Sequence, residues 1–376
     1  MTIDECFCFF EQGLHQYFDD GGVIDGVALP HTQKNPKKPK GIGCEMKTLA
    51  DSMTKILMHL EIVRKKNEHP NQKFAENSDA SIDGKVAKAP WHCAVTLRAC
   101  ENWFHTGRTI IADSAFSSVL TAFWLFVAGL YFIGIVKQCC KFYPVDLVTS
   151  AFSRMTDAAR KGAHIVYTSA KKMIPGDGTS VNMMAVGWSS SSKMKVLKKI
   201  ISTTSTTHEG TPHMKRGIQE IDHNGVTAKK CIKIPIDRPK VVQQLFDSFS
   251  AIDVHDHYRQ GILHFEDRWP TKDWRRRFLA TWLGMILTDA FLAYVFDCKN
   301  AGQDTMPITV FCSMIAKNLI FMDQITMRER PPTARQELQV HHSYYIPLIP
   351  LYYNYWNCIG NRCLCAYKNQ LSCIIY

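Results

Sequence analysis

Four aspartates in this sequence stand within or beside apolar segments, where an isolated charge is costly. Asp4 lies inside an apolar N-terminal run, and Asp113 ends a second short apolar run. Asp253 lies beside the apolar stripe of a helical pattern, and Asp256 lies on it. Carboxylates that are distant in sequence but meet at one sheet edge can bind two Mg²⁺ ions for in-line attack on a phosphodiester. Spacing alone leaves a second interpretation open, in which these are unrelated polar residues.

The apolar patterns predict the elements that would carry these acids. Residues 2–10 are dense in Ile, Phe and Cys, which is typical of a strand buried on both faces. Residues 109–113 predict another buried strand, and Ser114 is then the expected N-cap of a helix that ends at Gly129. The β-branched and aromatic run 131–137 predicts a further strand.

Further segments complete the predicted core. Residues 41–51 and 55–63 are strand-like and joined by a short turn, which indicates a β-hairpin. Residues 239–263 have apolar positions at helical spacing, so we expect one helix there. Residues 271–297 predict a long helix, and its Asp289 favours a protein core over a bilayer, where the charge would be costly.

The segment 114–136 has a competing interpretation as a membrane span. It contains no charged residue, and a helix of about 20 apolar residues crosses a bilayer. A spanning helix has no special need for Gly129 and Gly134, whereas a helix followed by a strand accounts for a break at the first of them. We therefore favour helix and strand, and keep a membrane-anchored protein as the less favoured alternative.

Composition limits the class of protein. The chain has 376 residues, 46% of them hydrophobic, which suffices for two or three domains and excludes a disordered protein. Lys plus Arg exceeds Asp plus Glu by 45 − 34 = 11, which indicates nucleic acid or an acidic membrane surface as partner, although a merely basic soluble protein fits as well. Most of the 14 cysteines stand in settings typical of reduced thiols, and no secretory signal is visible, so we expect an intracellular protein.

The character of the chain changes after the first apolar segments. Residues 139–235 are rich in Lys, Ser and Thr with some alternation, which predicts an inserted β-rich or mixed subdomain with basic edges. Residues 301–376 predict an irregular tail. Zn²⁺ is not expected in this tail, because its cysteines lack the C-x2-C spacing of a zinc site. These cysteines are Cys358, Cys363, Cys365 and Cys373.

Five sequence blocks in order resemble the piggyBac-type transposase domain, in particular that of piggyBac transposable-element-derived proteins. The blocks are TIDE, KPKGIGCEMKTLAD, GRTIIADSAFSS followed by LYFIGIVK, RPKVVQQLFDSFSAIDVHDHYRQG, and DWRRRFLATWLGMILTDAFLAYVF. They extend across roughly residues 2–297, and their shared order makes the match more specific than any one block.

The resemblance implies an α/β fold of the ribonuclease-H-like, integrase type, with a mixed sheet flanked by helices and an inserted subdomain. Residues 1–138 would form the first part of the catalytic core and 139–235 the insert. Residues 236–300 would form the second, helical part of the core. Residues 301–376 would then be the tail, with at most a remnant of the family's cysteine-rich module.

The resemblance also implies a site and a function. Asp4, Asp113 and Asp253 match the three catalytic, metal-binding aspartates, and Asp256 matches an additional acid. An active relative would use two Mg²⁺ or Mn²⁺ ions to nick DNA and transfer strands at transposon ends and target, in the nucleus, with a homodimer as a further option. The family's long N-terminal region is absent before Thr2, so a catalytically inactive, truncated or domesticated DNA-binding protein is the alternative.

Two basic clusters are candidates for contact with DNA phosphates. The motif NPKKPKG reads equally well as an exposed linker, and the triple arginine at the start of the helix 271–297 could equally be solvated. The candidate residues are Lys34, Lys37, Lys38, Lys40, Arg275, Arg276 and Arg277. His255 and His257 flank Asp256, and we expect them on the helix surface rather than on a transition metal, because positions i and i+2 face differently.

Overall fold

The computed structural model divides the chain into two units, Met1–Asn300 and Ala301–Tyr376, and each is described by itself. The residues that the structure describes are 1–9, 23–24, 27–28, 32–34, 42–63, 71–172, 178, 180–204, 208–223, 226–269, 271 and 274–328.

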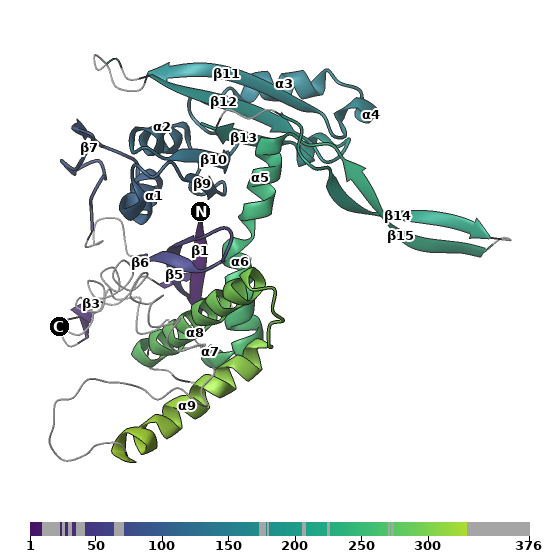
Figure 1. Ribbon diagram of the computed structural model, residues 1–376. Helices are drawn as coiled ribbons and strands as arrows, with labels where there is room; N and C mark the ends of the chain where they lie inside the picture. Colours follow the sequence, from purple (N-terminus) through teal and green to yellow (C-terminus); the bar gives the residue numbers. More distant parts are fainter. Residues whose placement is uncertain are drawn as a thin grey trace. The chain divides into compact units, whose positions relative to one another are not determined.

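The first unit is organised around one mixed β-sheet (Figure 1). Its strands are β1 (Thr2–Phe9), β4 (Thr32–Lys34), β5 (Ile42–Ala50), β6 (Leu57–Ile62), β9 (Thr109–Ala112), β10 (Tyr131–Ile135), β11 (His164–Lys172), β12 (Ser180–Trp188) and β13 (Lys198–Ser202). The order is β11-β12-β13-β10-β9-β1-β5-β4, with β6 also paired to β5. Strand β1 runs parallel to β9, and β9 parallel to β10, whereas the other pairs are antiparallel.

Small two-stranded ribbons and helices complete the first unit. The ribbons are β2 (Val23–Ile24) with β3 (Val27–Ala28), β7 (Ser81–Ile82) with β8 (Lys85–Val86), and β14 (His213–His223) with β15 (Val226–Ile236). The helices are α1 (Trp91–Cys100), η2 (Glu101–Trp103), α2 (Val119–Val127), α3 (Val145–Ser153), α4 (Asp157–Arg160), η3 (Met194–Val196), α5 (Lys240–Phe249), α6 (Ala251–Asp256), the π-helical η4 (His257–Leu263), α7 (Phe265–Arg268) and α8 (Trp274–Asn300).

Helices cover both faces of the sheet, and strand alternation decides which residue packs where. Ile3 and Ile110 face one side and pack with apolar residues of α1, α2 and α3. Ile111 points to the other side, where it packs against α5, and Cys6 packs there against α6 and α8. Both faces of β1 and β9 are therefore buried, as the dense apolar runs predict. The predicted strands and the hairpin of β5 and β6 are confirmed.

The segment 114–136 is not one helix, so its interpretation as a membrane span is wrong. Helix α2 has nine residues, and β10 lies within the sheet between β9 and β13. The predicted N-cap is also wrong, because Ser118 rather than Ser114 caps α2, through a hydrogen bond from the Thr121 amide at 3.0 Å. The residues after Asp113 instead form a turn, whose Ser117 amide donates to the Asp113 carbonyl at 3.1 Å.

One described helix, Arg275–Asn300, is long and apolar enough by length and composition to cross a membrane. However, 56% of its apolar stretch is buried inside the protein, and the core helix of a soluble protein meets the same criterion. This helix is the long helix predicted from 271–297, which is confirmed at the level of secondary structure.

Three other expectations are corrected. The single helix expected over 239–263 is interrupted at Ser250, which separates α5 from α6, and it continues as the π-helical η4. Within 139–235, the strands β11, β12 and β13 extend the main sheet through β10 and do not form a sheet of their own. In the second unit, α9 (Ile308–Arg328) replaces the start of the expected irregular tail, because its sequence contains neither Gly nor Pro to interrupt a helix. The four C-terminal cysteines lie outside the described residues.

Gly134 of β10 provides a test of how tightly the turn after Asp113 is packed. A Cβ atom at residue 134 would overlap Ser117 Oγ, which donates to the Asp113 carbonyl at 2.6 Å. We predict that Gly134→Ala lowers the free energy of unfolding by about 1 to 3 kcal/mol, measured by urea denaturation. Ser117→Ala removes the nearest of the overlapping atoms and leaves the overlap with the Phe132 ring, so the double variant should lose less than the sum of the single losses. Strictly additive losses would contradict the contact.

Candidate functional site

The sheet register brings Asp4 and Asp113 to neighbouring strands. Thr2 pairs with Ile111 and Ile3 with Ala112, so the next residue on each strand is an aspartate. Both carboxylates are partly buried and anchored locally. Asp4 accepts a hydrogen bond from the Glu5 amide at 2.8 Å, and Asp113 accepts one from the Ala115 amide at 2.7 Å.

Asp253 approaches the same place from a different element. It is an exposed residue in the first turn of α6, a helix that packs against β1. The pKa of Asp4 is raised to about 7, first by burial and then by the charges of Asp113 and Asp253, while the hydrogen bond from the Glu5 amide opposes the rise. The pKa of Asp113 is also raised, first by burial and then by the charge of Glu5. The three predicted acids therefore share one electrostatic neighbourhood, where additional negative charge is costly.

The three acids offer oxygen donors of the kind that a divalent metal ion requires. Carboxylate oxygens are the ligands that Mg²⁺ prefers, and a cation relieves repulsion among acids. Within the described part of the chain, however, no three His, Cys, Asp or Glu side chains lie close enough together to hold one metal ion. The chemistry of the donors fits a divalent cation, whereas their present spacing does not form a coordination shell.

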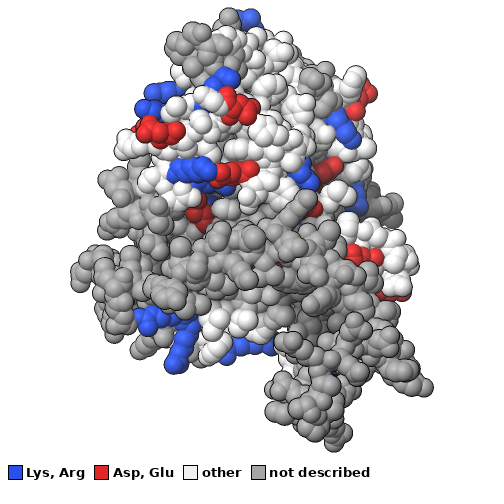
Figure 2. Space-filling model, turned by 60° about the vertical axis from the view of Figure 1, so that its left-hand side comes forward, with Lys and Arg blue, Asp and Glu red and all other residues white. Residues whose placement is uncertain are grey.

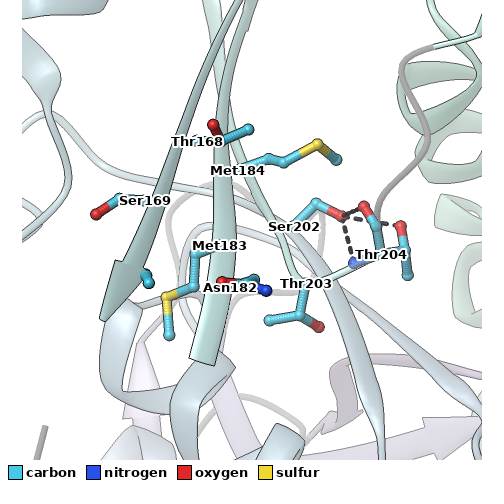
Figure 3. A pocket seen from close by; sticks show the side chains of 9 residues that line it. Thr168, Ser169, Asn182, Met183, Met184, Ser202, Thr203 and Thr204 are labelled. Atoms are coloured by element: carbon cyan, nitrogen blue, oxygen red, sulfur yellow. Dashed lines mark hydrogen bonds between the residues drawn. The ribbon is translucent and has the colours of Figure 1, made fainter. Parts of the chain in front are cut away.

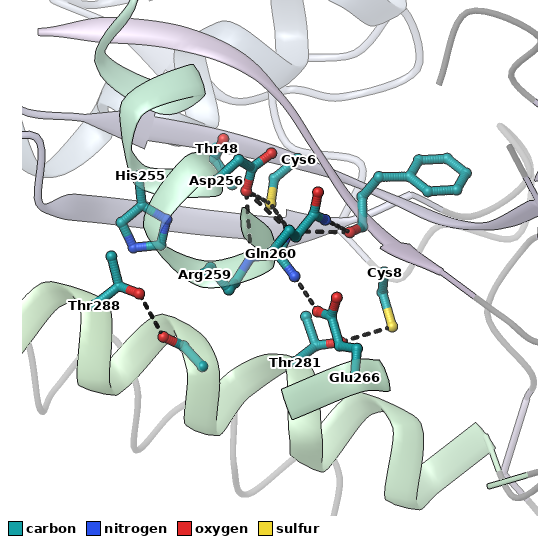
Figure 4. Close-up of polar contacts among 12 residues, drawn as sticks. Cys6, Cys8, Thr48, His255, Asp256, Arg259, Gln260, Glu266, Thr281 and Thr288 are labelled. Carbon is teal, nitrogen blue, oxygen red and sulfur yellow. Dashed lines mark hydrogen bonds and ion pairs between the residues drawn. The ribbon is translucent and has the colours of Figure 1, made fainter. Parts of the chain in front are cut away.

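Asp256 makes contacts of a different kind, in a buried cluster between β1 and η4 (Figure 4). Its Oδ1 accepts from Cys6 Sγ at 3.1 Å and pairs with Arg259 Nη2 at 2.9 Å. Arg259, with a side chain 1% exposed, also pairs with Glu266 and donates to the Phe7 carbonyl at 3.1 Å. The described contacts of Asp256 thus join α6 to β1, and its role as an additional catalytic acid stays a prediction.

A partly buried lysine near the turn that follows Asp113 was not identified from the sequence. Lys47 on β5 stands opposite Glu5 on β1, donates to its carboxylate at 2.6 Å and also pairs with Glu45. Its Nζ lies 4.9 Å from the ring centroid of Phe116, three residues after Asp113. Burial alone would lower the pKa of Lys47, but the charges of Glu5 and Glu45 raise it above its usual value. The cross-strand pairing of the two N-terminal strands is the signal that could have located this cluster.

The expectation for His255 is wrong, because this side chain is fully buried, whereas His257 is exposed as expected. His255 Nε2 lies 3.2 Å from Asp289 Oδ1, although the geometry is not that of a hydrogen bond. Asp289 also accepts from the Leu57 amide at 2.9 Å. The buried position of His255 follows from the packing of α6 on α8, which the sequence alone does not reveal.

The predicted DNA-contact residues separate into three groups. Arg275 and Arg276 are exposed at the start of α8. Arg277 is only 2% exposed and donates to the Glu266 carbonyl, so its predicted role as a phosphate contact is wrong. Lys34 lies on β4, and Lys37, Lys38 and Lys40 fall outside the described residues.

A pocket of about 410 Å³ lies elsewhere, on the outer strands of the sheet (Figure 3). It is lined by Thr168, Ser169, Ala170, Asn182, Met183, Met184, Ser202, Thr203 and Thr204. Ser202 Oγ accepts from the Thr204 amide at 3.0 Å, and none of the lining residues is a carboxylate. This pocket is therefore separate from the acidic site.

The fold of this chain is similar to that of a solved transposase. The solved cryo-EM structure of a piggyBac transposase synaptic complex with hairpin DNA is similar to this chain, with a TM-score of 0.56 and 14% sequence identity. The similarity covers 89% of this chain and 55% of that one, so the chain spans about half the length of that transposase. The predicted ribonuclease-H-like α/β fold and the resemblance to the piggyBac-type domain are confirmed.

The sequence itself matches the family described as Transposase IS4 over residues 22–291, which is more than half of the chain. The chain belongs to this family. A search of the curated proteins finds no significant match.

The buried Arg259 cluster yields a stability prediction. Arg259→Met would leave Asp256 and Glu266 without their shared cation, so we predict a loss of about 3 to 5 kcal/mol in the free energy of unfolding. Arg268→Met is the matched control, because Arg268 is exposed on the adjacent helix α7 and should change stability by about 0.5 kcal/mol or less. Chemical denaturation of both variants provides the measurement. Equal losses in the two variants would contradict the importance of the cluster.

Proposed function

We propose that this chain is a transposase-derived DNA-binding protein that nicks DNA and transfers strands, with Asp4, Asp113 and Asp253 as ligands for Mg²⁺ or Mn²⁺. The observation that carries the proposal is the parallel register of β1 and β9, whose last pair, Ile3 with Ala112, is followed by Asp4 and Asp113. The charge of Asp253 raises the pKa of Asp4, which supports Asp253 as the third ligand. Family membership supports the reaction class.

Each element would contribute differently to this chemistry. Asp4 is held by a central strand, and Asp113 by a turn whose Ala115 amide orients the carboxylate, so these two acids are preorganised. Asp253 is exposed on α6, where its carboxylate would be accessible to a metal ion that also binds a DNA phosphate. Divalent ions, when bound, supply activation of a water or 3′-hydroxyl and stabilisation of the leaving oxygen. The ion pair of Asp256 with Arg259 would hold α6 against β1 while DNA binds.

The proposal includes partners and a location. Transposon-end and target DNA are the proposed substrates, and the similar solved transposase is bound to hairpin DNA. A nuclear location follows from these substrates, and a homodimer is proposed because strand transfer must hold more than one DNA end.

A second candidate function is DNA binding without catalysis, by a transposase-derived protein that has lost activity. It is favoured by the spacing of the acids, since among the described side chains no group of three could hold a metal ion. The contacts of Asp256 with Cys6 and Arg259 fit this alternative as well, because a carboxylate in an ion pair is less available to a metal.

A nicking assay separates the two candidates. We predict Mg²⁺- or Mn²⁺-dependent nicking of supercoiled DNA, and loss of at least 100-fold in rate, roughly 3 kcal/mol, in Asp113→Asn because one ligand oxygen loses its charge. Asp146→Asn, which changes an exposed acid on α3, is the matched control and should retain the rate. Salt-sensitive DNA binding without nicking would favour the inactive protein, and nicking that Asp113→Asn leaves unchanged would exclude the assigned site.

Metal binding can be measured without activity. We predict that Mn²⁺ raises the melting temperature of the wild-type protein, because a ligand of the native state stabilises that state by mass action. Asp113→Asn should lose most of this shift, and Asp146→Asn should keep it. An equal shift in both variants would place the bound ion elsewhere on the protein.

A further inference from the structure

On the face shown in Figure 2, the described residues do not form one large patch of positive charge. In the upper part of Figure 2, the described Lys and Arg residues lie beside Asp and Glu, so charges of both signs are mixed there. The hairpin of β14 and β15 is different. Its basic residues are Lys215, Arg216, Lys229, Lys230 and Lys233, against Glu220 and Asp222.

This hairpin is long and pairs only with itself among the described strands. Each strand has 11 residues, and the ribbon projects away from the main sheet (Figure 1). An isolated two-stranded ribbon is at best marginally stable in water, so its sequence should avoid further destabilising contacts. A contact of that kind is nevertheless present.

Arg216 and Lys233 are directly opposite each other in the register, and both side chains are exposed. Side chains at opposite positions of an antiparallel pair lie about 5 Å apart at Cβ, and like charges there destabilise the ribbon. Neither residue takes part in an ion pair with a described acid. Along the base of the ribbon, Met214, Arg216 and Lys233 are exposed, whereas Ile234, next to Lys233, is half-buried. Since successive side chains of a strand point to opposite faces, Arg216 and Lys233 share the solvent-facing side.

The base of the hairpin is fixed to the sheet that carries the acids. Lys215 Nζ donates to the Ser190 carbonyl at 3.2 Å, and Ile236 is buried in the cluster formed with α5. The rings of Trp188 and His213 meet at 6.1 Å between centroids, in an edge arrangement. These contacts fix the base of the ribbon to the end of β12 and to the residues that follow it. The positions of Arg216 and Lys233 near this base are therefore fixed relative to β12.

We propose that the solvent-facing side of this hairpin binds the phosphate backbone of a DNA duplex, with Arg216 and Lys233 as the contacting cations. Phosphates turn the repulsion between these residues into a favourable interaction, and a two-stranded ribbon has dimensions that a duplex groove admits. The inference rests on the proposed function, because it assigns a surface to the DNA that the acidic site would process.

The test compares two variants that each lose two positive charges. Arg216→Gln/Lys233→Gln removes the proposed contacts, and Lys88→Gln/Arg154→Gln removes two exposed cations from other parts of the first unit. Duplex affinity is measured for unrelated sequences over a range of salt concentrations, after thermal unfolding has verified that both variants fold. In the hairpin variant, but not in the control variant, we expect the negative slope of log K against log salt concentration to become shallower by about 1.8, or 0.9 for each lost phosphate contact.

Alkylation of Cys231 gives a second readout, because this exposed thiol lies two residues from Lys233 on the same side of the ribbon. Saturating duplex should slow its modification in the wild-type protein but not in the hairpin variant. Equal salt slopes for the two variants, or unprotected Cys231, would overturn the hairpin surface while leaving DNA binding intact. Failure of the wild-type chain to bind any duplex would overturn the proposed function and this inference together.

Discussion

Repulsion among carboxylates at the end of β9 is the constraint on which the rest of the site depends. The parallel pairing of β1 with β9 places Asp4 and Asp113 on adjacent strands, and α6 adds Asp253 from the next layer. Partial burial makes the charges of Asp4 and Asp113 more costly, and together with the neighbouring acids it raises the pKa of Asp4 to about 7. A bound cation stabilises a site of this kind, and a further unpaired acid destabilises it. Accordingly, the carboxylate of Glu5 forms an ion pair with Lys47 on β5.

The second layer of helices determines how the third acid is held. Arg259 contacts both Asp256 and the carbonyl of Phe7, so it connects the start of η4 to the central strand. The break at Ser250 gives α6 an orientation that a continuous helix from α5 would not have. The position of Asp253 therefore depends on a buried ion pair and a helix interruption, which are both outside the acidic site itself.

The sequence allowed the strands and the hairpin to be predicted, because burial on both faces leaves a local signal, whereas the assignment of the three acids as a site stays a prediction. Other features depend on tertiary packing and have no such signal. The burial of His255 and Arg277 is decided by contacts of α6 and α7 with α8, and on an isolated helix both residues look solvated. The N-cap of α2 is Ser118 and not the predicted Ser114, because the residues after Asp113 form a turn in which the Ala115 amide donates to the Asp113 side chain. The helix therefore begins after this turn.

The central claim is that Asp4, Asp113 and Asp253 together bind divalent cations. Crystals of the protein soaked in Mn²⁺ and recorded at a wavelength of strong anomalous scattering would locate the ions directly. The account predicts manganese peaks bonded to carboxylate oxygens of these three residues, at distances of about 2.0 to 2.6 Å. Manganese found only at other surface carboxylates, with these three acids unligated, would contradict it.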